Sequence, residues 1–194
     1  IPEEFGGAGM SISQYIETVK QISYAAPAYR STMSINVGMT GSAIKNFGTT
    51  EQKDFWLPRI ASGEIACFGL TEPGSGSDSA AMQTMAVRDG NGYKLTGTKR
   101  YITNSPAAKI GLIMARTSKE ALPKNAHVSA FIVDMTSPGI SIGKSDKKMG
   151  QAGGVAAGPA DGQLRAGEPA GRRGITLPGG HPVPAAQSAQ RLIG

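Results

Sequence analysis

The sequence predicts an α+β fold in which helices come first, a mainly antiparallel β domain follows, and an irregular C-terminal tail ends the chain. In residues 11–63 apolar side chains recur at intervals of three and four, the period of a helix with one buried face. In residues 65–143 the apolar runs are short and are separated by turn residues. From residue 153 onward there is no aromatic residue and Gly, Ala and Pro predominate, so this stretch should not build a core.

Three helices are expected before residue 64. Ser11 and Gln14 have the spacing of a capping box, and Pro27 marks the end of a first helix over residues 11–26, whose apolar face comprises Ile12, Tyr15, Ile16, Val19 and Ile22. A second helix over residues 31–47 carries small and flexible side chains that permit close packing. A third helix, which Thr49 and Gln52 could cap, stops by Gly63 and carries Phe55, Trp56 and Leu57.

Six strands are expected after the helices. They cover residues 65–71, 84–88, 93–98, 109–116, 128–134 and 140–143. Asp89-Gly90-Asn91-Gly92 separates the second from the third and predicts a hairpin, because these residue types tolerate positive φ. We therefore expect a helical domain over residues 1–64, a β domain over residues 65–151 and a tail over residues 152–194.

Charge and composition exclude several classes of function. The net charge is +6, but Lys and Arg are scattered, and the short pairs, including Lys99-Arg100, are interpreted as solvated; we expect no nucleic-acid partner. No apolar stretch is long enough to span a bilayer. The single Cys67 lies in an apolar run and is expected to be a buried side chain, and no Cys/His cluster predicts a metal site. His127 is expected to be a surface or a satisfied histidine.

Two short segments hold the most specific signal. An apolar run, Cys67-Phe68-Gly69-Leu70, leads into Thr71-Glu72-Pro73-Gly74-Ser75-Gly76-Ser77-Asp78, a loop whose glycines let the backbone approach a ligand. It is not a P-loop, since no Gly-Lys-Ser/Thr follows, and it lacks the third Gly of a Rossmann fingerprint. The second segment, Tyr101-Ile102-Thr103-Asn104, could cover a planar ring and hydrogen-bond its edge.

Both segments resemble signatures of the acyl-CoA dehydrogenase family, in which the second is usually Trp-Ile-Thr-Asn. Further similarity lies in Ile1-Pro2-Glu3-Glu4-Phe5-Gly6-Gly7-Ala8-Gly9, in Phe47-Gly48-Thr49-Thr50-Glu51-Gln52-Lys53 with Leu57-Pro58, and in Lys147-Lys148-Met149-Gly150. The resemblance covers residues 1–151. It implies a fragment comprising the end of an N-terminal helical domain and most of a middle β domain, with the C-terminal helical bundle of the family missing.

The resemblance implies FAD as the cofactor and assigns roles by matching position. Thr71 would hydrogen-bond the pyrimidine side of the flavin, Ser77 would also meet the acyl-CoA, and the Thr103 hydroxyl would reach the N5 edge. Tyr101 replaces the commoner Trp but retains a flat face. The residues expected to bind the cofactor are Phe68, Gly69, Leu70, Thr71, Glu72, Pro73, Gly74, Ser75, Gly76, Ser77, Tyr101, Ile102 and Thr103.

No catalytic residue is assigned within this chain. In the family the base that removes the α-proton is a Glu of the C-terminal bundle, so Glu72 is interpreted as a structural part of its loop. After residue 151 the resemblance stops, and either a frameshift near residues 151–154 or a genuine disordered tail would explain the change. We therefore expect the chain by itself to be inactive, to lack the last strand of the β domain and to bind flavin weakly at best.

The activity implied is α,β-dehydrogenation of an acyl-CoA thioester in fatty-acid β-oxidation or branched-chain acyl breakdown. An electron-transfer flavoprotein would accept the electrons, and the intact enzyme would be a homo-oligomer in the bacterial cytoplasm, which we favour, or in the mitochondrial matrix. Two alternatives remain: an acyl-CoA oxidase or flavin monooxygenase of the same fold, and a non-catalytic flavin or acyl-CoA binding module.

Overall fold

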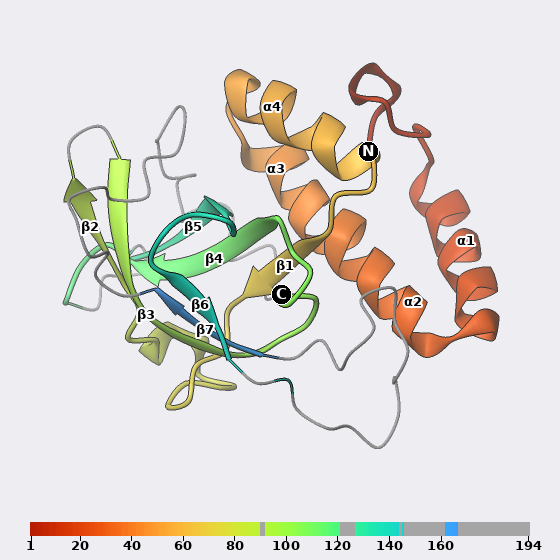
Figure 1. Cartoon of the computed structure of the whole chain (residues 1–194). Coiled ribbons are helices and arrows are strands. Elements are labelled where there is room, and N and C mark those ends of the chain that lie inside the picture. The colour runs from red at the N-terminus through yellow and green to blue at the C-terminus, as the bar shows by residue number, and fades with distance from the viewer. Residues whose placement is uncertain (90–91, 121–126, 144, 146–161, 167–194) are drawn as a thin grey trace.

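A computed structural model describes residues 1–89, 92–120, 127–143, 145 and 162–166. Within them, the helices gather on one side of the molecule and the strands on the other (Figure 1). The order of elements confirms the α+β prediction. The turn residues 90–91 and the motif at residues 147–150 lie outside the described residues, as do residues 152–161 and 167–194 of the expected tail.

The helical part contains α1 (Ile12–Ala25), α2 (Pro27–Met33), α3 (Ser42–Phe47) and α4 (Thr50–Ala61). Both predicted capping boxes are present: Ser11 accepts from the Gln14 amide, and Thr49 accepts from the Gln52 amide. A short 3-10 turn, Glu3–Phe5, precedes them. Gly63, with φ 97°, follows α4 in the left-handed region, as expected of a residue that ends a helix.

The second predicted helix differs in its start and in its winding. It begins at Pro27, which ends α1 and also serves as the first residue of α2, a position that needs no N–H donor. Between α2 and α3 the chain continues as a π-helical segment, Ser34–Gly41. Wider winding of this kind often accompanies functional sites, and here it places buried Asn36 and Thr40 toward the sheet.

The strands are β1 (Ala66–Gly69), β2 (Met85–Asp89), β3 (Gly92–Ile102), β4 (Ile110–Arg116), β5 (Val128–Asp134), β6 (Ile140–Ile142) and β7 (Gly162–Ala166). Their order is β1-β4-β2-β3-β7-β6, with β5 on β4. Asp89 pairs with Gly92, which confirms the β2–β3 hairpin. β2–β3, β4–β5, β3–β7 and β6–β7 are antiparallel.

Two features of the sheet depart from the expectations. β1 pairs in parallel with β4, and Met85 of β2 pairs in parallel with Arg116, so the sheet is mixed. β7 lies within the segment expected to be irregular and pairs with both β3 and β6, so a strand is present where none was expected. Backbone hydrogen bonding to two neighbours can stabilise a strand in a sequence with few apolar residues.

The core is divided into two clusters by the sheet. On the helical side, Ile44, Trp56 and Leu57 pack with strand residues that include Leu112. On the opposite face, Cys67, Ile113 and Phe131 belong to a second cluster. β4 and β5 are consequently buried on both faces, which explains why their sequences read as continuous apolar runs instead of alternating ones.

Two polar side chains connect the helices to β1. Asn36 Nδ2 donates to the Glu64 carbonyl at 3.0 Å, and Asn36 Oδ1 accepts from the Ala66 amide. Thr40 Oγ1 donates to the Cys67 carbonyl at 3.3 Å. These contacts fix the start of β1, and therefore the loop that follows it, relative to the helices.

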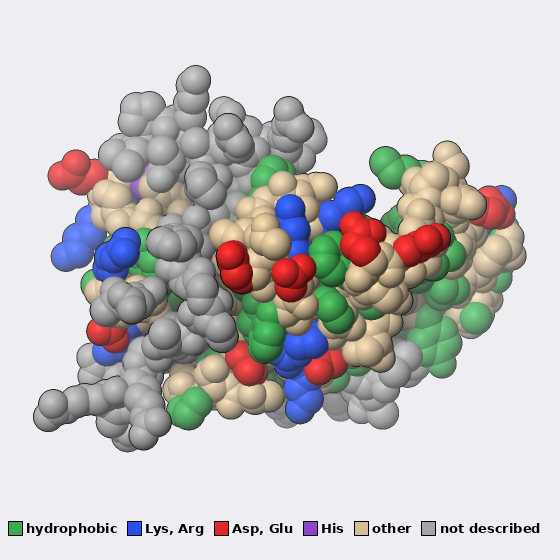
Figure 2. Space-filling view, turned by 90° about the horizontal axis from the view of Figure 1, so that it is seen from above, with side chains coloured by type: hydrophobic (Ala, Val, Ile, Leu, Met, Phe, Trp, Pro, Cys, Tyr) green, Lys and Arg blue, Asp and Glu red, His purple; other side chains and the backbone are tan. Residues whose placement is uncertain are grey.

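The outer face of α1 leaves apolar side chains exposed, and hydrophobic atoms are visible over the helical part in Figure 2. Ile12 is 79% and Ile16 is 59% exposed, although the sequence pattern placed both on the buried face. The other half of that pattern, Tyr15 and Val19, is half-buried. A cavity of about 310 Å³ lies beside it, between α1, the π-helical segment, α4 and the N-terminal loop. No described helix is long and apolar enough to cross a membrane.

Candidate flavin-binding site

The structure brings the two signature segments together. The Arg100 amide donates to the Thr71 carbonyl at 2.8 Å, and Lys99 Nζ donates to the Leu70 carbonyl at 3.1 Å. The loop after β1 therefore lies against the end of β3, directly beside Tyr101. This contact joins segments about thirty residues apart, and neither sequence pattern alone indicates it.

The glycine loop is a closed turn with an open outer surface. The Glu72 amide donates to the Ser75 carbonyl at 2.9 Å, the Ser75 amide donates back at 3.2 Å, and Ser75 Oγ donates to the Asp78 carbonyl at 2.6 Å. A Cβ added at Gly74 or Gly76 would meet no atom within 4 Å. The loop is thus held by its own hydrogen bonds and has open space at Gly74 and Gly76, which a flat ligand could cover.

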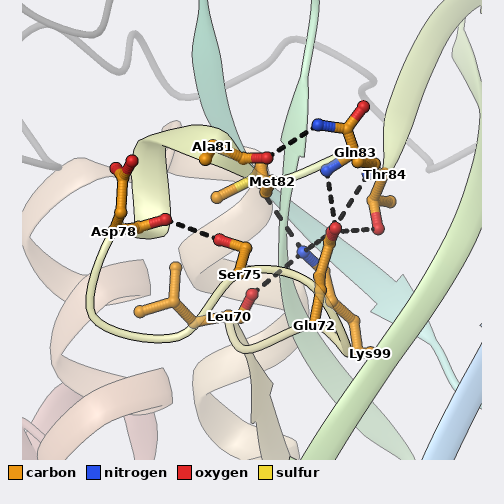
Figure 3. A network of polar contacts seen from close by, with 9 residues as sticks. All are labelled: Leu70, Glu72, Ser75, Asp78, Ala81, Met82, Gln83, Thr84 and Lys99. Carbon is orange, nitrogen blue, oxygen red and sulfur yellow. Dashed lines mark hydrogen bonds and ion pairs between the residues drawn. The ribbon is translucent and has the colours of Figure 1, made fainter.

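Glu72 points inward from this loop (Figure 3). Its carboxylate accepts from the Gln83 amide at 2.6 Å, from the Thr84 amide at 3.0 Å, from the Thr84 hydroxyl and from Lys99 Nζ at 2.7 Å. Burial alone would raise the pKa of this carboxyl, but the hydrogen bonds from Lys99, Thr84 and Gln83 outweigh burial and hold its pKa below the usual value. Glu72 is therefore ionised and fully engaged, in agreement with a structural role and not with that of a base.

Lys99 corrects an interpretation made from the sequence. The Lys99-Arg100 pair was expected to be solvated, but the Lys99 side chain is 1% exposed. Burial lowers the pKa of its ammonium group, and the ion pair with Glu72 partly offsets that shift. Position in β3 could have indicated this burial, because Lys99 and the buried Leu95 are four residues apart and lie on the same face of a strand.

Tyr101 occupies the left-handed region, with φ 58°, and its side chain is 55% exposed. Such a conformation is unfavourable for a bulky residue and is concentrated at functional sites. The Arg100 guanidinium lies 4.7 Å from the centre of the Tyr101 ring. The register of β3 with β7 shifts between Lys99 and Ile102, so the strand is irregular where Tyr101 turns its ring outward.

The other predicted site residues divide into outward and inward positions. Ser77, Pro73, Gly74 and Gly76 are exposed, and Phe68, Leu70, Thr71 and Thr103 are half-buried. Ile102 is 1% exposed and belongs to the core cluster on the far face, so any contact it makes with a cofactor would use its main chain. Gly69 and Ser75 are buried as well. The binding roles of all these residues remain predictions.

Asn104 has a structural role that was not expected from the sequence. It has φ 71°, its Nδ2 donates to the Ala66 carbonyl at 3.0 Å, and its Oδ1 accepts from Thr32 Oγ1 at 3.3 Å. It therefore connects the second segment to β1 and to α2. The tolerance of Asn for positive φ, together with its place in the motif, was the signal in the sequence that could have indicated this structural role.

Two other side chains lie as the sequence predicted. His127 is 2% exposed and its Nε2 lies 3.4 Å from the Ala80 carbonyl, so it is a satisfied histidine. Cys67 is fully buried, and burial raises the pKa of its thiol to about 12. Among the described residues, no cluster of three His, Cys, Asp or Glu side chains is arranged to hold a metal ion.

The donor set at this edge of the sheet fits a planar heterocycle with hydrogen-bonding edges. An outward-facing aromatic ring, the hydroxyls of Thr71 and Thr103 and a glycine loop with open space above it come from segments that contact each other. Two family models match the chain: the N-terminal domain of acyl-CoA dehydrogenases over residues 1–64 and their middle domain over residues 67–157. The chain belongs to the acyl-CoA dehydrogenase family.

Individual relatives agree with this assignment. The human mitochondrial short-chain specific acyl-CoA dehydrogenase is 38% identical over 151 residues, which are 77% of this chain and 36% of that protein. A glutaryl-CoA dehydrogenase from Mycobacterium smegmatis, solved in complex with FADH2, has a TM-score of 0.75 and 29% identity over 93% of this chain and 42% of that one.

A solved oxidase has the same fold. The prolyl acyl carrier protein oxidase AnaB has a TM-score of 0.79 and 27% identity over 94% of this chain and 47% of that chain. The chain spans between a third and a half of the length of these relatives. The activity, substrate and partners of a whole enzyme are therefore matters for proposal.

Proposed function

We propose that this chain carries the flavin-binding part of an FAD-dependent acyl-CoA dehydrogenase. The observation that carries the proposal is the contact between the Thr71 loop and the Tyr101 segment through the Arg100 amide. The similarity to a glutaryl-CoA dehydrogenase solved with FADH2 supports FAD as the cofactor. When bound, the flavin supplies a hydride acceptor at N5.

In this proposal the residues of this chain bind and orient the flavin and the acyl-CoA. Tyr101 covers one face of the ring, and the Thr71 and Thr103 hydroxyls donate to its edges, where donors stabilise the negative charge that develops on reduction. Ser77 is exposed beyond the turn, and we assign to it the contact with the acyl-CoA thioester. The removal of the α-proton is not assigned to Glu72, because that carboxylate is occupied by four hydrogen-bond donors.

The partners follow from the same proposal. An acyl-CoA thioester is the substrate, an electron-transfer flavoprotein accepts the electrons, and the whole enzyme is a homo-oligomer. The name of the human relative specifies short-chain substrates, and we extend to this chain only the wider class of acyl-CoA thioesters.

An oxidase is the second candidate, because the AnaB structure shares the fold. Flavin loading followed by chemical reduction and exposure to air separates the two. A dehydrogenase predicts that the oxidised absorbance of the bound flavin returns more slowly than that of free reduced FAD in the same buffer, and an oxidase predicts a return at least as fast as that of free FAD. Because we expect this chain to bind flavin weakly, it is loaded with FAD in large excess, and a chain that takes up no FAD even then would contradict both candidates and leave the acyl-CoA binding module.

A further inference from the structure

Lys99 joins three separate parts of the site through one buried ammonium group. Its Nζ donates to the Leu70 carbonyl at 3.1 Å and to Glu72 Oε1 at 2.7 Å, and it lies 3.8 Å from Met82 Sδ. An ammonium group has three hydrogens to donate, and three acceptors surround it. The end of β1, the glycine loop and the segment before β2 are therefore all tied to one position of β3.

Glu72 extends this connection to the start of β2. Its carboxylate holds the amides of Gln83 and Thr84 in addition to Lys99. Figure 3 shows the Lys99 ammonium group and the Glu72 carboxylate meeting within this network, with the loop that carries Ser75 and Asp78 to their left. Among the described residues, four protein donors occupy the carboxylate, and these contacts hold the loop against β2 and β3.

The network fixes the main chain that would face a flavin. Lys99 holds the Leu70 carbonyl, and the next residue along β3, Arg100, holds the Thr71 carbonyl through its amide. Consecutive carbonyls of the loop are therefore bound to consecutive residues of the strand that leads directly into Tyr101. This arrangement fixes the distance between the two segments to which we assign the ring.

Resting on the proposed function, we propose that the buried Glu72–Lys99 ion pair positions the loop from Leu70 to Ser77 against Tyr101 and Thr103 for binding an isoalloxazine ring. A buried ion pair is weak evidence for added stability, because desolvation of both charges opposes their attraction. It is selective for geometry, since each charge needs its partner in place. Glu72 and Lys99 are positioning residues in this account.

Hydrogen exchange on the full 194-residue chain tests the positioning directly. Lys99→Met keeps an apolar stem of similar length and removes the charge. The matched control is Lys20→Met, the same chemical change, which breaks the exposed Lys20–Glu17 ion pair of 3.4 Å on α1, fifty residues before the loop in the sequence. Glu72→Gln combined with Lys99→Met removes both charges and retains one acceptor oxygen for the Thr84 amide, while the side-chain NH2 replaces the oxygen that accepts from the Gln83 amide.

We expect Lys99→Met to speed exchange in peptides containing residues 70–77 and 83–84 about tenfold more than in peptides from β4 and β5. The double variant should recover part of that protection, because no charge is left buried alone. Lys20→Met should leave the loop unchanged. Uniform acceleration throughout the sheet, or no change in the loop, would show that the pair is merely structural and would overturn the inference.

FAD titration of the same proteins supplies the second readout. Lys99→Met should raise the dissociation constant for FAD at least about fivefold, and Lys20→Met should leave it within about twofold of the value for the unsubstituted chain. Unchanged FAD affinity in a folded Lys99→Met protein would overturn the inference while leaving the proposed function standing. Absence of FAD binding by the unsubstituted chain would count against the proposed function, and hydrogen exchange would then decide the positioning role alone.

Discussion

Asn36 provides a sensitive test of how the helices are coupled to the site. Its side chain is 9% exposed and lies in the π-helical segment. Its Nδ2 donates to the Glu64 carbonyl at 3.0 Å and its Oδ1 accepts from the Ala66 amide at the start of β1, the strand that leads to Thr71. Asn36→Ala removes both partners at once and leaves two backbone groups without them.

The expected loss follows from the burial of those groups. A buried donor or acceptor left without a partner costs about 1–3 kcal/mol. Ala66 is fully buried, so its amide falls toward the upper part of that range, whereas Glu64 is only half-buried and falls toward the lower part. The free energy of unfolding should therefore decrease by roughly 2–4 kcal/mol.

Urea unfolding followed by circular dichroism measures this change, with Asn46→Ala as the matched control. Asn46 is exposed on α3, so its replacement should change stability by no more than about 0.5 kcal/mol, in the stabilising direction, because Ala has the higher helix propensity. A loss below about 1 kcal/mol for Asn36→Ala, or a loss equal to that of the control, would refute the reasoning.

Three further results are expected. The folded-state pKa of Glu72 lies below its usual value near 4.5, so its contribution to stability is complete above pH 4.5 and is lost as the pH falls through the folded-state pKa. The urea midpoint should therefore drop with acidification, and Glu72→Gln should make that drop smaller. Cys67, with a pKa of about 12, should resist alkylation in the folded chain at mildly alkaline pH and react once urea is added; rapid labelling without urea would contradict its burial. Gly69→Ala should destabilise the fold by about 1–3 kcal/mol, because its Cβ would lie 2.7 Å from Ile113 Cδ1. Gly74→Ala, whose Cβ meets no atom within 4 Å, should leave the melting temperature unchanged. Equal melting temperatures for these two variants would contradict the close packing at Gly69.

The predictable parts of the fold are those encoded by local pattern. The capping boxes at Ser11 and Thr49 were read correctly because spacing alone determines them. The parallel pairing of β1 with β4 was missed, because no local sequence pattern specifies the pairing of strands that lie about forty residues apart. The exposure of Ile12 and Ile16 shows that an apolar stripe predicts a face that can pack, but does not predict which element packs on it.

The site was predictable in composition more than in geometry. The motif identified the glycine loop and the Tyr101 segment, but it did not show which of their residues are exposed. Gly74 and Gly76 have open space beside them, whereas Ile102 is buried in the core. The burial of Lys99 was missed because charged side chains are almost always exposed unless they are paired, and its partner Glu72 is 27 residues away in the sequence. Long-range pairing is a property of the fold that local reading does not supply.

Titration of FAD into the unsubstituted chain and into Gly76→Val, followed by the visible circular dichroism of the flavin, tests the central claim most directly. A Cβ added at position 76 meets no atom within 4 Å, so Gly76→Val should fold with little change in stability, but the valine side chain would occupy the space assigned to the ring. The account predicts saturable binding with induced dichroism for the unsubstituted chain and markedly weaker binding for Gly76→Val. Equal affinity in the two proteins, or no saturable binding by the unsubstituted chain, would contradict the claim that this loop binds a flavin.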